Sequence, residues 1–322
     1  MWTGSIRSIT MIFTLTLNPA IDYVMTLPSF SEGAVNRSAE EELFFGGKGI
    51  NVSIILSRLG IPSTALGFTA GFTGAAIEQG LSAQGISTDF IRLPSGNSRI
   101  NVKLKSTQET EINGSGPSVS QKDLDLLFHK LNTVQSGDFL VIAGSVPASL
   151  PSGIYEQILS RLSGKGILFA VDAAGSLLTK VLKYRPFLIK PNHIELGELF
   201  QTEITTPQQA AEYAAELQKR GAVNVLVSMA EQGCILIDET GTVTPMKAPA
   251  GKVINSVGAG DSALAGFLAG YLSRSDYPYA LALATAAGSA TAFSKDLADK
   301  EHIQRLLEEV TLLNSEMCKK KC

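Results

Sequence analysis

The sequence has few cysteines, little net charge and no long hydrophobic run. Its 322 residues include three cysteines, Cys234, Cys318 and Cys322, which form no CxxC pair. An odd and widely spaced set argues against a disulfide framework or a zinc site and suits a reducing compartment. The formal net charge is −3 with scattered Lys and Arg, whereas nucleic-acid binding needs a basic face. We therefore predict a cytoplasmic protein that binds no nucleic acid.

Two apolar stretches resemble membrane signals only weakly. Residues 9–17 alternate threonine with apolar residues, which is the pattern of a strand rather than of a signal peptide. Residues 264–272 have about half the length that a membrane span needs. Both stretches are expected in the core, and no membrane association is predicted. Residues 1–10 are predicted to be an N-terminal extension and residues 314–322 a solvated C-terminal tail.

Strands alternate with helices along most of the chain. Apolar runs at residues 139–143, 168–172, 187–190 and 223–228 are separated by amphipathic helical patterns. This alternation predicts an α/β fold with a mainly parallel sheet and helices on both faces. No repeat or linker divides the chain, so we expect one domain over residues 11–313.

Two segments predict a small sheet outside the main one, at about residues 23–45 and 97–113. Residues 99–105, RINVKLK, alternate so that a strand would place Arg99 and Lys103 on one face and the apolar side chains on the other. A solvated edge strand commonly carries lysine in this way. The functional alternative is a flap whose basic face holds an anionic substrate and whose apolar face contacts a partner.

Two glycine-rich loops, residues 46–51 and 255–262, each precede a helical pattern. Glycines admit a ligand close to the backbone, and a helix N-terminus attracts an anion. The first loop is not a P-loop, because no Ser or Thr follows Lys48. Asp261 is expected at or near the N-cap of the second helix. A carboxylate there could take a proton from a hydroxyl while backbone amides stabilise a transferring phosphoryl group. A plain helix-entry turn is the structural alternative.

Polar residues also follow the C-terminal ends of predicted strands, where open α/β sheets bind ligands. Asp22, Asn192 and Ser228 occupy such positions. Asn192 and Glu195 are three residues apart at a helix start, so they share one face and suit Mg²⁺ bound largely through water. The same spacing is that of a capping box.

The two glycine loops, in this order, resemble the two signatures of the ribokinase-like sugar kinases, the phosphofructokinase B family. The resemblance runs from about Ile12 to Val310. Residues 18–22, 99–105, 110–117, 190–192 and 287–292 are most similar to the branch of the family that phosphorylates fructose 1-phosphate. That branch transfers the γ-phosphoryl group of ATP to give fructose 1,6-bisphosphate, and we expect the same reaction here.

The resemblance implies a role for each matching residue. Asp261 would be the catalytic base, beside an anion hole formed by the backbone of Gly258, Ala259 and Gly260. The residues expected to hold the phosphosugar are Asp22, Gly46, Gly47, Lys48, Asn51, Arg99, Lys103 and Arg37. Those expected to bind ATP are Lys190, Asn192, Ser228, Ala230, Gly233, Ser256, Gly258, Gly260 and Gly288. Many relatives have Gly at the position of Ala230 and Thr at that of Ser256.

The resemblance also implies cofactors and a partner. ATP and Mg²⁺ are expected, with Asn192 and Glu195 keeping Mg²⁺ in place through water. K⁺, which some relatives bind, would lie beside Asn255 and Val257. In many members the small sheet is a lid that also forms a dimer contact, so a homodimer through the lid is expected.

Two other functions stay open. A tagatose 6-phosphate kinase of the same family would use the same chemistry. A non-catalytic regulator that binds a sugar phosphate or nucleotide would share the fold. A nicotinamide-binding domain does not fit, because no G-x-G-x-x-G opens the first βα unit.

Overall fold

The computed structural model describes the backbone of residues 10–320 and the side chains of residues 10–315. Its main sheet has ten strands, nine of them in the order β14-β13-β12-β11-β10-β9-β1-β4-β5, with β6 paired to β4. All neighbours are parallel except β12–β13 and β13–β14. The strands are β1 (Ile12–Thr16), β4 (Ser63–Ala70), β5 (Ser87–Thr88), β6 (Ile91–Leu93), β9 (Phe139–Ala143), β10 (Leu168–Asp172), β11 (Leu188–Ile189), β12 (Asn224–Ser228), β13 (Cys234–Ile237) and β14 (Val243–Met246).

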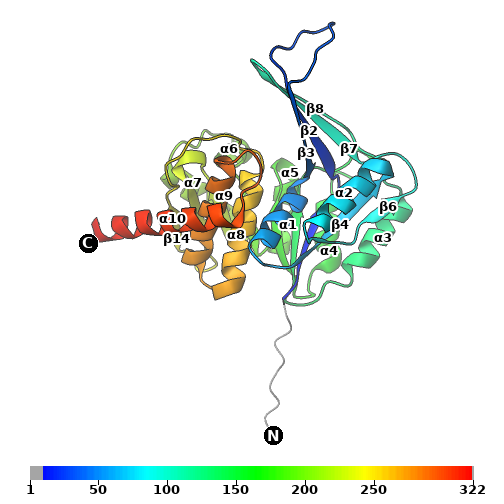
Figure 1. The fold of residues 1–322 in the computed structure, drawn as a ribbon. Helices are drawn as coiled ribbons and strands as arrows, with labels where there is room; N and C mark the ends of the chain where they lie inside the picture. The colour runs from blue at the N-terminus through cyan, green and yellow to red at the C-terminus, as the bar shows by residue number, and fades with distance from the viewer. Residues whose placement is uncertain (1–9, 321–322) are drawn as a thin grey trace.

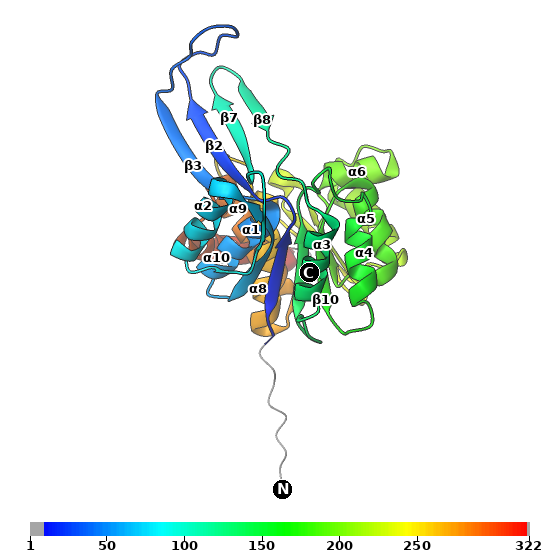
Figure 2. The same ribbon diagram turned by 90° about the vertical axis from the view of Figure 1, so that its right-hand side faces the viewer.

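Helices cover both faces of this sheet, which confirms the predicted α/β architecture (Figures 1 and 2). One face carries α3 (Gln121–Leu131), α4 (Ile154–Leu162), α5 (Gly175–Val181), α6 (His193–Phe200) and α7 (Pro207–Lys219). The other carries α1 (Lys48–Arg58), α2 (Gly71–Ala83), α8 (Ala259–Arg274), α9 (Tyr277–Ala292) and α10 (Lys300–Lys320). Because both faces are covered, the central strands are buried throughout, as β9 is over all five residues.

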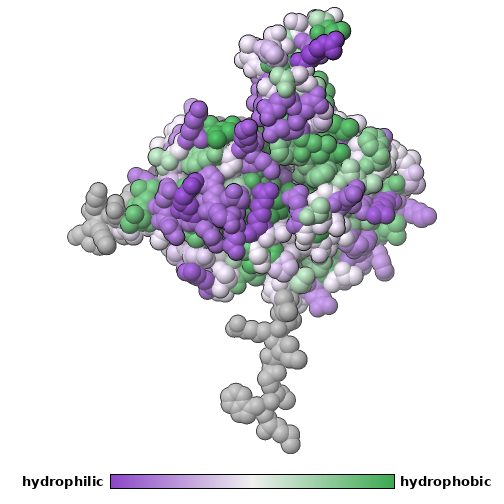
Figure 3. Space-filling model, in the orientation of Figure 1, coloured by the Kyte–Doolittle hydropathy of each residue, from purple (hydrophilic) through white to green (hydrophobic). Residues whose placement is uncertain are grey.

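A second sheet of four strands stands out from the body as a lid (Figures 1 and 2). Its order is β3-β2-β7-β8, formed by β2 (Ala20–Thr26), β3 (Glu40–Gly46), β7 (Arg99–Lys105) and β8 (Glu109–Asn113). The lid therefore lies where the sequence predicted strands outside the main sheet. On the face of the molecule in Figure 3, hydrophobic residues gather on the body beside the base of this lid.

The register of the lid separates its two faces. Leu43, Ile100 and Ile112 lie on one face, because Leu43 pairs with Tyr23, which pairs with Val102, which pairs with Ile112. All three side chains are exposed. The alternate positions carry Arg99 and Lys103 on the opposite, polar face. The predicted division of this strand into a basic and an apolar face is confirmed.

Three boundaries differ from those predicted. Asp22 lies within β2 rather than in a loop after the first strand, because β2 begins four residues after β1 ends. Helix α8 begins at Ala259 with Gly258 as its cap, so Asp261 lies near the cap, as the third residue of the helix, rather than at it. Helix α10 continues to residue 320, so most of the predicted tail is helical. Residues 1–9 of the predicted extension lie outside the described residues. No helix within the described part of the chain has the length and hydropathy to cross a membrane.

Candidate active site

A cleft of about 360 Å³ lies where strand ends of the main sheet meet the polar face of the lid. The N-termini of α1 and α8 open into it from their glycine loops. Its charged lining comes from segments far apart in the sequence: Asp22, Lys48, Arg99, Asp172, Lys190, Glu195 and Asp261. The structure thus brings together most of the residues that the sequence predicted for a site.

Asp261 is a buried carboxylate in the first turn of α8, with 5% of its surface exposed. One of its oxygens, Oδ2, accepts a hydrogen bond from Asn51 Nδ2 at 2.7 Å. Burial and the nearby charge of Asp172 raise the pKa of Asp261 to about 6, against the opposing effects of Lys48, Asn51 and Lys190. A base with a pKa in this range is deprotonated at neutral pH and still basic enough to take a proton.

The loop before Asp261 can bind an anion. Gly258 has φ of 79°, a left-handed conformation that favours glycine, and a Cβ there would lie 2.6 Å from Leu297 Cδ2. The amide of Ala259 donates to the carbonyl of Ser256 at 3.3 Å. The amides of Gly260 and Asp261 have no backbone acceptor among residues 10–320. These two amides, at the positive end of α8, are the free donors of the predicted anion hole.

Lys48 and Lys190 both contact Asp172, a residue that the sequence analysis missed. Lys48 Nζ lies 3.0 Å from Asp172 Oδ1, and Lys190 Nζ lies 3.2 Å from Asp172 Oδ2. Although burial opposes it, the two ammonium groups lower the pKa of Asp172. Burial likewise lowers the pKa of Lys48, but Asp172 and Asp261 outweigh it and raise that pKa to about 12. Asp172 ends a predicted core strand, which is the signal that could have identified it.

Asp22 is held by the lid and by the first glycine loop. Asn101 Nδ2 donates to Asp22 Oδ1 at 2.7 Å. A Cβ on Gly46 would lie 2.7 Å from Asp22 Oδ2, so any other residue there would force the Asp22 carboxylate to shift. The structure therefore gives Gly46 the role of admitting Asp22 to the cleft.

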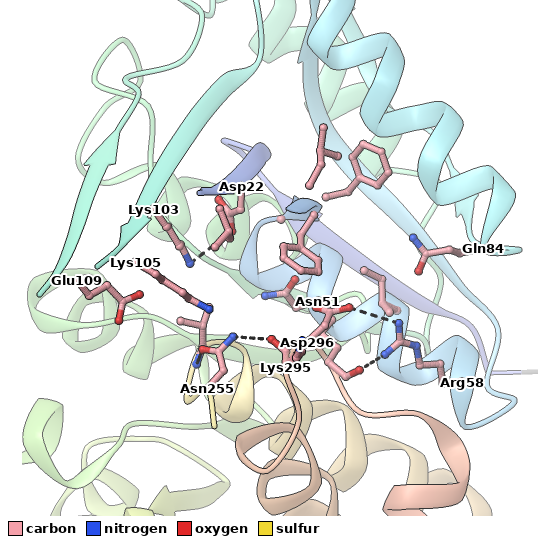
Figure 4. Close-up of a pocket in the computed structure, with 18 residues that line it drawn as sticks. Asp22, Asn51, Arg58, Gln84, Lys103, Lys105, Glu109, Asn255, Lys295 and Asp296 are labelled. Atoms are coloured by element: carbon pink, nitrogen blue, oxygen red, sulfur yellow. Dashed lines mark hydrogen bonds and ion pairs between the residues drawn. The ribbon is translucent and has the colours of Figure 1, made fainter. Parts of the chain in front are cut away.

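Arg99 and Lys103, predicted as a pair, face different hollows. Arg99 lines the cleft that holds Asp261. Lys103 lines a second hollow of about 450 Å³, which also has Asp22 in its wall, beside Lys105 and Lys295 (Figure 4). Lys103 also lies 3.8 Å from Asp22 and 3.9 Å from Glu111, so carboxylates already offset its charge.

Arg99 has no such partner. It is half-buried, and its Nε donates to the carbonyl of Asn18 at 3.0 Å. Within residues 10–315 no carboxylate forms an ion pair with it. Burial lowers the pKa of Arg99 while the charge of Asp22 opposes that shift. A half-buried guanidinium with no carboxylate within ion-pair distance is suited to an anionic ligand.

Asn192 and Glu195 form the capping box that the sequence allowed as an alternative. Asn192 Oδ1 accepts from the amide of Glu195 at 2.8 Å, and Glu195 Oε2 accepts from the amide of Asn192 at 2.9 Å. Both still line the cleft, beside Ser228. The second carboxylate oxygen of Glu195 makes no hydrogen bond within the described residues. The capping box thus fixes the Glu195 carboxylate at the cleft through one oxygen and leaves the other oxygen available to a ligand.

Several predicted residues do not line the cleft. Arg37 is exposed in the loop between β2 and β3. Gly233 and Gly288 have packing reasons to be glycine, since a Cβ would lie 2.1 Å from the Met246 carbonyl oxygen or 3.2 Å from that of Ala259. The others predicted for the site that lie outside this lining are Gly46, Lys103, Ala230, Asn255, Ser256 and Ala259.

Comparison with known proteins extends these observations. The model of the pfkB family of carbohydrate kinases matches residues 15–303. The 1-phosphofructokinase of Bacillus subtilis is 45% identical over 300 residues, which cover 93% of this chain and 98% of that protein. The D-tagatose-1-phosphate kinase of Bacillus licheniformis is 36% identical, with 94% and 99% covered.

Solved structures are similar over the same length. Phosphofructokinase-2 from Escherichia coli, in complex with substrates and products, has a TM-score of 0.88 and 26% identity, covering 94% of this chain and 100% of that one. The same enzyme in complex with potassium has a TM-score of 0.86 and 25% identity, with the same coverage. These similarities show a ribokinase-like fold, and in this chain a separate small sheet accompanies the main one.

Proposed function

The chain belongs to the pfkB family of carbohydrate kinases, and on that premise we propose that it phosphorylates fructose 1-phosphate to fructose 1,6-bisphosphate with ATP. The 45% identity to a 1-phosphofructokinase over nearly the whole of both chains supports this choice of acceptor. An intact carboxylate at Asp261 and an intact glycine loop support turnover over a purely regulatory role.

The unpaired guanidinium of Arg99 is the observation that carries the assignment to a phosphosugar. It lines the same cleft as Asp261 and has no ion-pair partner within residues 10–315. A free sugar would leave this half-buried charge without an anion, whereas the phosphate already on the acceptor would pair with it through two parallel hydrogen bonds. Arg99 is therefore assigned to the acceptor's phosphate. Lys103 was predicted for the same role, but its neighbouring carboxylates make it the weaker candidate.

Asp261 would remove the proton from the acceptor hydroxyl. Its Oδ2 is held by Asn51, which leaves Oδ1 to face the hydroxyl. The freed oxygen attacks the γ-phosphorus in line, the bond to the β-phosphate oxygen breaks, and ADP leaves with that electron pair. The amides of Gly260 and Asp261 and the ammonium of Lys190 would stabilise the charge on the transferring group. Lys48 and Asn51, at the start of α1, would orient the sugar between Asp22 and the base.

Mg²⁺ and K⁺ stay proposals that the site residues fit to different degrees. Within the described residues no three acidic, His or Cys side chains converge as a metal cage. This suits Mg²⁺ held mostly by phosphate oxygens and water, with the unused oxygen of Glu195 as the protein contact. When bound, Mg²⁺ would neutralise charge on the β- and γ-phosphates.

For K⁺, the loop that carries Asn255 is fixed in place. Asn255 Oδ1 accepts from the Val257 amide at 3.0 Å, and Asn255 Nδ2 donates to the Lys295 carbonyl at 3.0 Å. A loop fixed by these two bonds of the Asn255 side chain could present its carbonyls to a cation.

We also propose that the apolar face of the lid forms a homodimer contact. Leu43, Ile100 and Ile112 are exposed on that face, with relative exposures of 48%, 41% and 58%. Exposed apolar side chains gathered on one sheet face are typical of a protein contact. An Ile112→Glu variant should be monomeric by size-exclusion chromatography with light scattering while the native chain is dimeric. A native monomer would contradict this contact.

A second acceptor is tagatose 1-phosphate. The kinase from Bacillus licheniformis that is 36% identical to this chain carries that name. The relatives thus favour this sugar over tagatose 6-phosphate as the second candidate, and both 1-phosphates would present the same phosphate to Arg99. Cytoplasmic location stays a prediction.

A coupled ADP-release assay tests the function. Mg-ATP would be offered with fructose 1-phosphate, tagatose 1-phosphate, tagatose 6-phosphate, fructose 6-phosphate and free fructose, and with Asp261→Asn as the inactive control. The highest kcat/KM is expected for fructose 1-phosphate. A higher value for a tagatose phosphate would correct the acceptor and keep the chemistry. ATP binding with no turnover of any acceptor would overturn the proposed reaction.

A further inference from the structure

The carboxylate of Asp172 has no role in the reaction as described so far, yet it lies at the centre of the cleft. Only 1% of its surface is exposed, and it is the residue that both Lys48 and Lys190 contact. Its Oδ1 accepts a hydrogen bond from Lys48 at 3.0 Å. Its Oδ2 lies 3.2 Å from Lys190 Nζ without hydrogen-bond geometry, and finds no other partner in the described residues.

The sheet places Asp172 and Lys190 side by side. Val171 pairs with Ile189 across β10 and β11, so the next residues follow in register: Asp172 is the last residue of β10, and Lys190 directly follows β11. Two residues earlier on each strand, Ala170 and Leu188 pack into the same cluster as α8 and α9. Side chains alternate along a strand, so Asp172 and Lys190 point to that same side, beneath the start of α8.

Lys48 reaches Asp172 from a helix rather than from the sheet. It is the first residue of α1, and its Cβ passes over Gly144, where the position of an added Cβ would lie 3.7 Å away. Lys190 Nζ lies 3.1 Å from the position of a Cβ on Gly260, directly under the anion hole. One carboxylate therefore joins a lysine of the sugar loop to a lysine of the phosphoryl site.

A purely structural reason for this arrangement is weak. Burying a carboxylate costs free energy that one well-bonded lysine could offset, and replacing such groups by apolar residues is often neutral for folding. Here two lysines share one carboxylate, and Oδ2 is left with an incomplete bond. Two ammonium groups fixed close together repel each other, and a transferring phosphoryl group would relieve that repulsion.

We propose that Asp172 is a positioning residue that holds Lys48 and Lys190 on either side of the path of the transferring phosphoryl group. The inference rests on the proposed kinase function. Asp172 need not touch either substrate. Its effect on rate would pass through the two lysines, whose placement relative to the phosphoryl group is what catalysis requires.

The charges around Asp261 add a second consequence. It is faced by Asp172 from β10, Lys48 from α1 and Lys190 from the end of β11, and the cleft also holds Asp22, Arg99 and Glu195. Asp172 is the neighbouring charge that opposes ionisation of Asp261. Removing it should shift the acidic limb of the pH–rate profile to lower pH, which loss of a structural ion pair elsewhere would not do.

The experiment compares Asp172→Asn with the native enzyme in the ADP-release assay. We expect kcat to fall by about 100-fold, the scale of a misplaced catalytic group. The KM for ATP should stay within about threefold, because the variant gains positive charge near the phosphates. The acidic limb should move down in pH. Native kcat and an unshifted limb in Asp172→Asn would overturn the proposal.

Coupling to the lysines provides the second readout. In Asp172→Asn/Lys190→Met, which removes one charge of each sign, the loss in kcat should be at least about fivefold smaller than the product of the two single losses. Fully multiplicative losses would overturn the proposal. If Asp172→Asn alone does not fold, the isoelectric pair is compared with Lys190→Met instead: its kcat should be at most about 20-fold lower, and a further loss of about 100-fold would overturn the proposal.

Asp138→Asn is the matched control. Asp138 is also a buried aspartate, at the opposite end of the neighbouring strand β9, where its oxygens accept from the amides of Met11 and Gln135, both at 2.9 Å. Its variant should keep native kcat and the native pH profile. The turnover of the native enzyme distinguishes a failure of the proposed kinase function from a failure of the inference about Asp172. No turnover by the native enzyme refutes the kinase, whereas native turnover with an unaffected Asp172→Asn refutes only this inference.

Discussion

Replacing Asp261 by Asn should lower turnover by orders of magnitude and at the same time stabilise the fold. The carboxylate is 5% exposed and lies near Asp172, and its pKa is raised to about 6. A rise of about two pKa units corresponds to about 3 kcal/mol of unfavourable free energy when the group is charged. Asn is neutral and nearly the same size, and its carbonyl can still accept from Asn51.

The pH dependence follows from the direction of this shift. A carboxyl whose pKa is raised in the folded state destabilises the fold fully above the folded value, about 6, and not at all below the unfolded value, about 4. At pH 7.5 the variant should therefore gain about 1 to 3 kcal/mol, which is a rise of a few degrees in the midpoint of thermal unfolding. The gain should vanish as the pH falls from 6 to 4.

Calorimetry at several pH values measures the expected gain in stability, and the ADP-release assay measures the expected loss of turnover. We expect kcat to fall by about 10² to 10⁴-fold, as for loss of a general base. Asp138→Asn is the contrasting control, expected to lose stability and keep kcat, because its carboxylate accepts backbone amides. A lower unfolding midpoint for Asp261→Asn than for the native protein at pH 7.5 would refute the conclusion that the base is desolvated. A gain in stability that does not change with pH would refute it as well. Near-native kcat would refute the base itself.

Three further predictions use the same assays. Arg99→Ala should raise the KM for the phosphosugar by about 10- to 100-fold with little change in the KM for ATP, because it removes a charged hydrogen bond to the phosphate. Arg92→Ala is the control, because Arg92 is exposed and pairs with Glu78. A large fall in kcat at unchanged KM in Arg99→Ala would contradict the assignment. In native enzyme, kcat/KM should decline below about pH 6, because only the charged form of Asp261 accepts a proton, and a profile that stays flat to pH 5 would exclude it as the base. Ala230→Gly should raise stability by about 0.5 to 1 kcal/mol in urea unfolding, because Ala230 has φ of 49°, where Cβ is strained; a loss of stability would show that the strain is absent.

Local patterns were sufficient for the elements and for part of the site. Strands β9 and β10 have the predicted bounds, because parallel strands buried on both faces are short apolar runs. The alternation over residues 99–105 also gave the two faces of β7 correctly. Asp22 was misplaced because a proline after β1 indicates where a strand stops, but not that another strand begins immediately in a second sheet.

The site shows where local patterns stop being informative. Asp172 looked like the last residue of an ordinary strand, and only the pairing of β10 with β11 and the entry of α1 over Gly144 bring two lysines to it. Lys103 and Arg99 share a face of one strand, yet Asp22 divides the space in front of them into two hollows. Such separations depend on how the lid sits on the body, to which several distant segments contribute.

The sequence by itself determined the fold class and the two glycine loops, and it predicted Asp261 as the base, because each of these depends on residues close together in the chain. Gly258 and Gly260 next to Asp261 can be read without knowing what lies opposite. The tertiary structure alone decided the charge balance of the cleft. It pairs Lys48 and Lys190 with Asp172, leaves Arg99 without an ion-pair partner within the described residues, and places Asp172 near Asp261. Those facts depend on distances of a few ångströms between side chains that are 18 to 124 residues apart, and no local pattern encodes such distances.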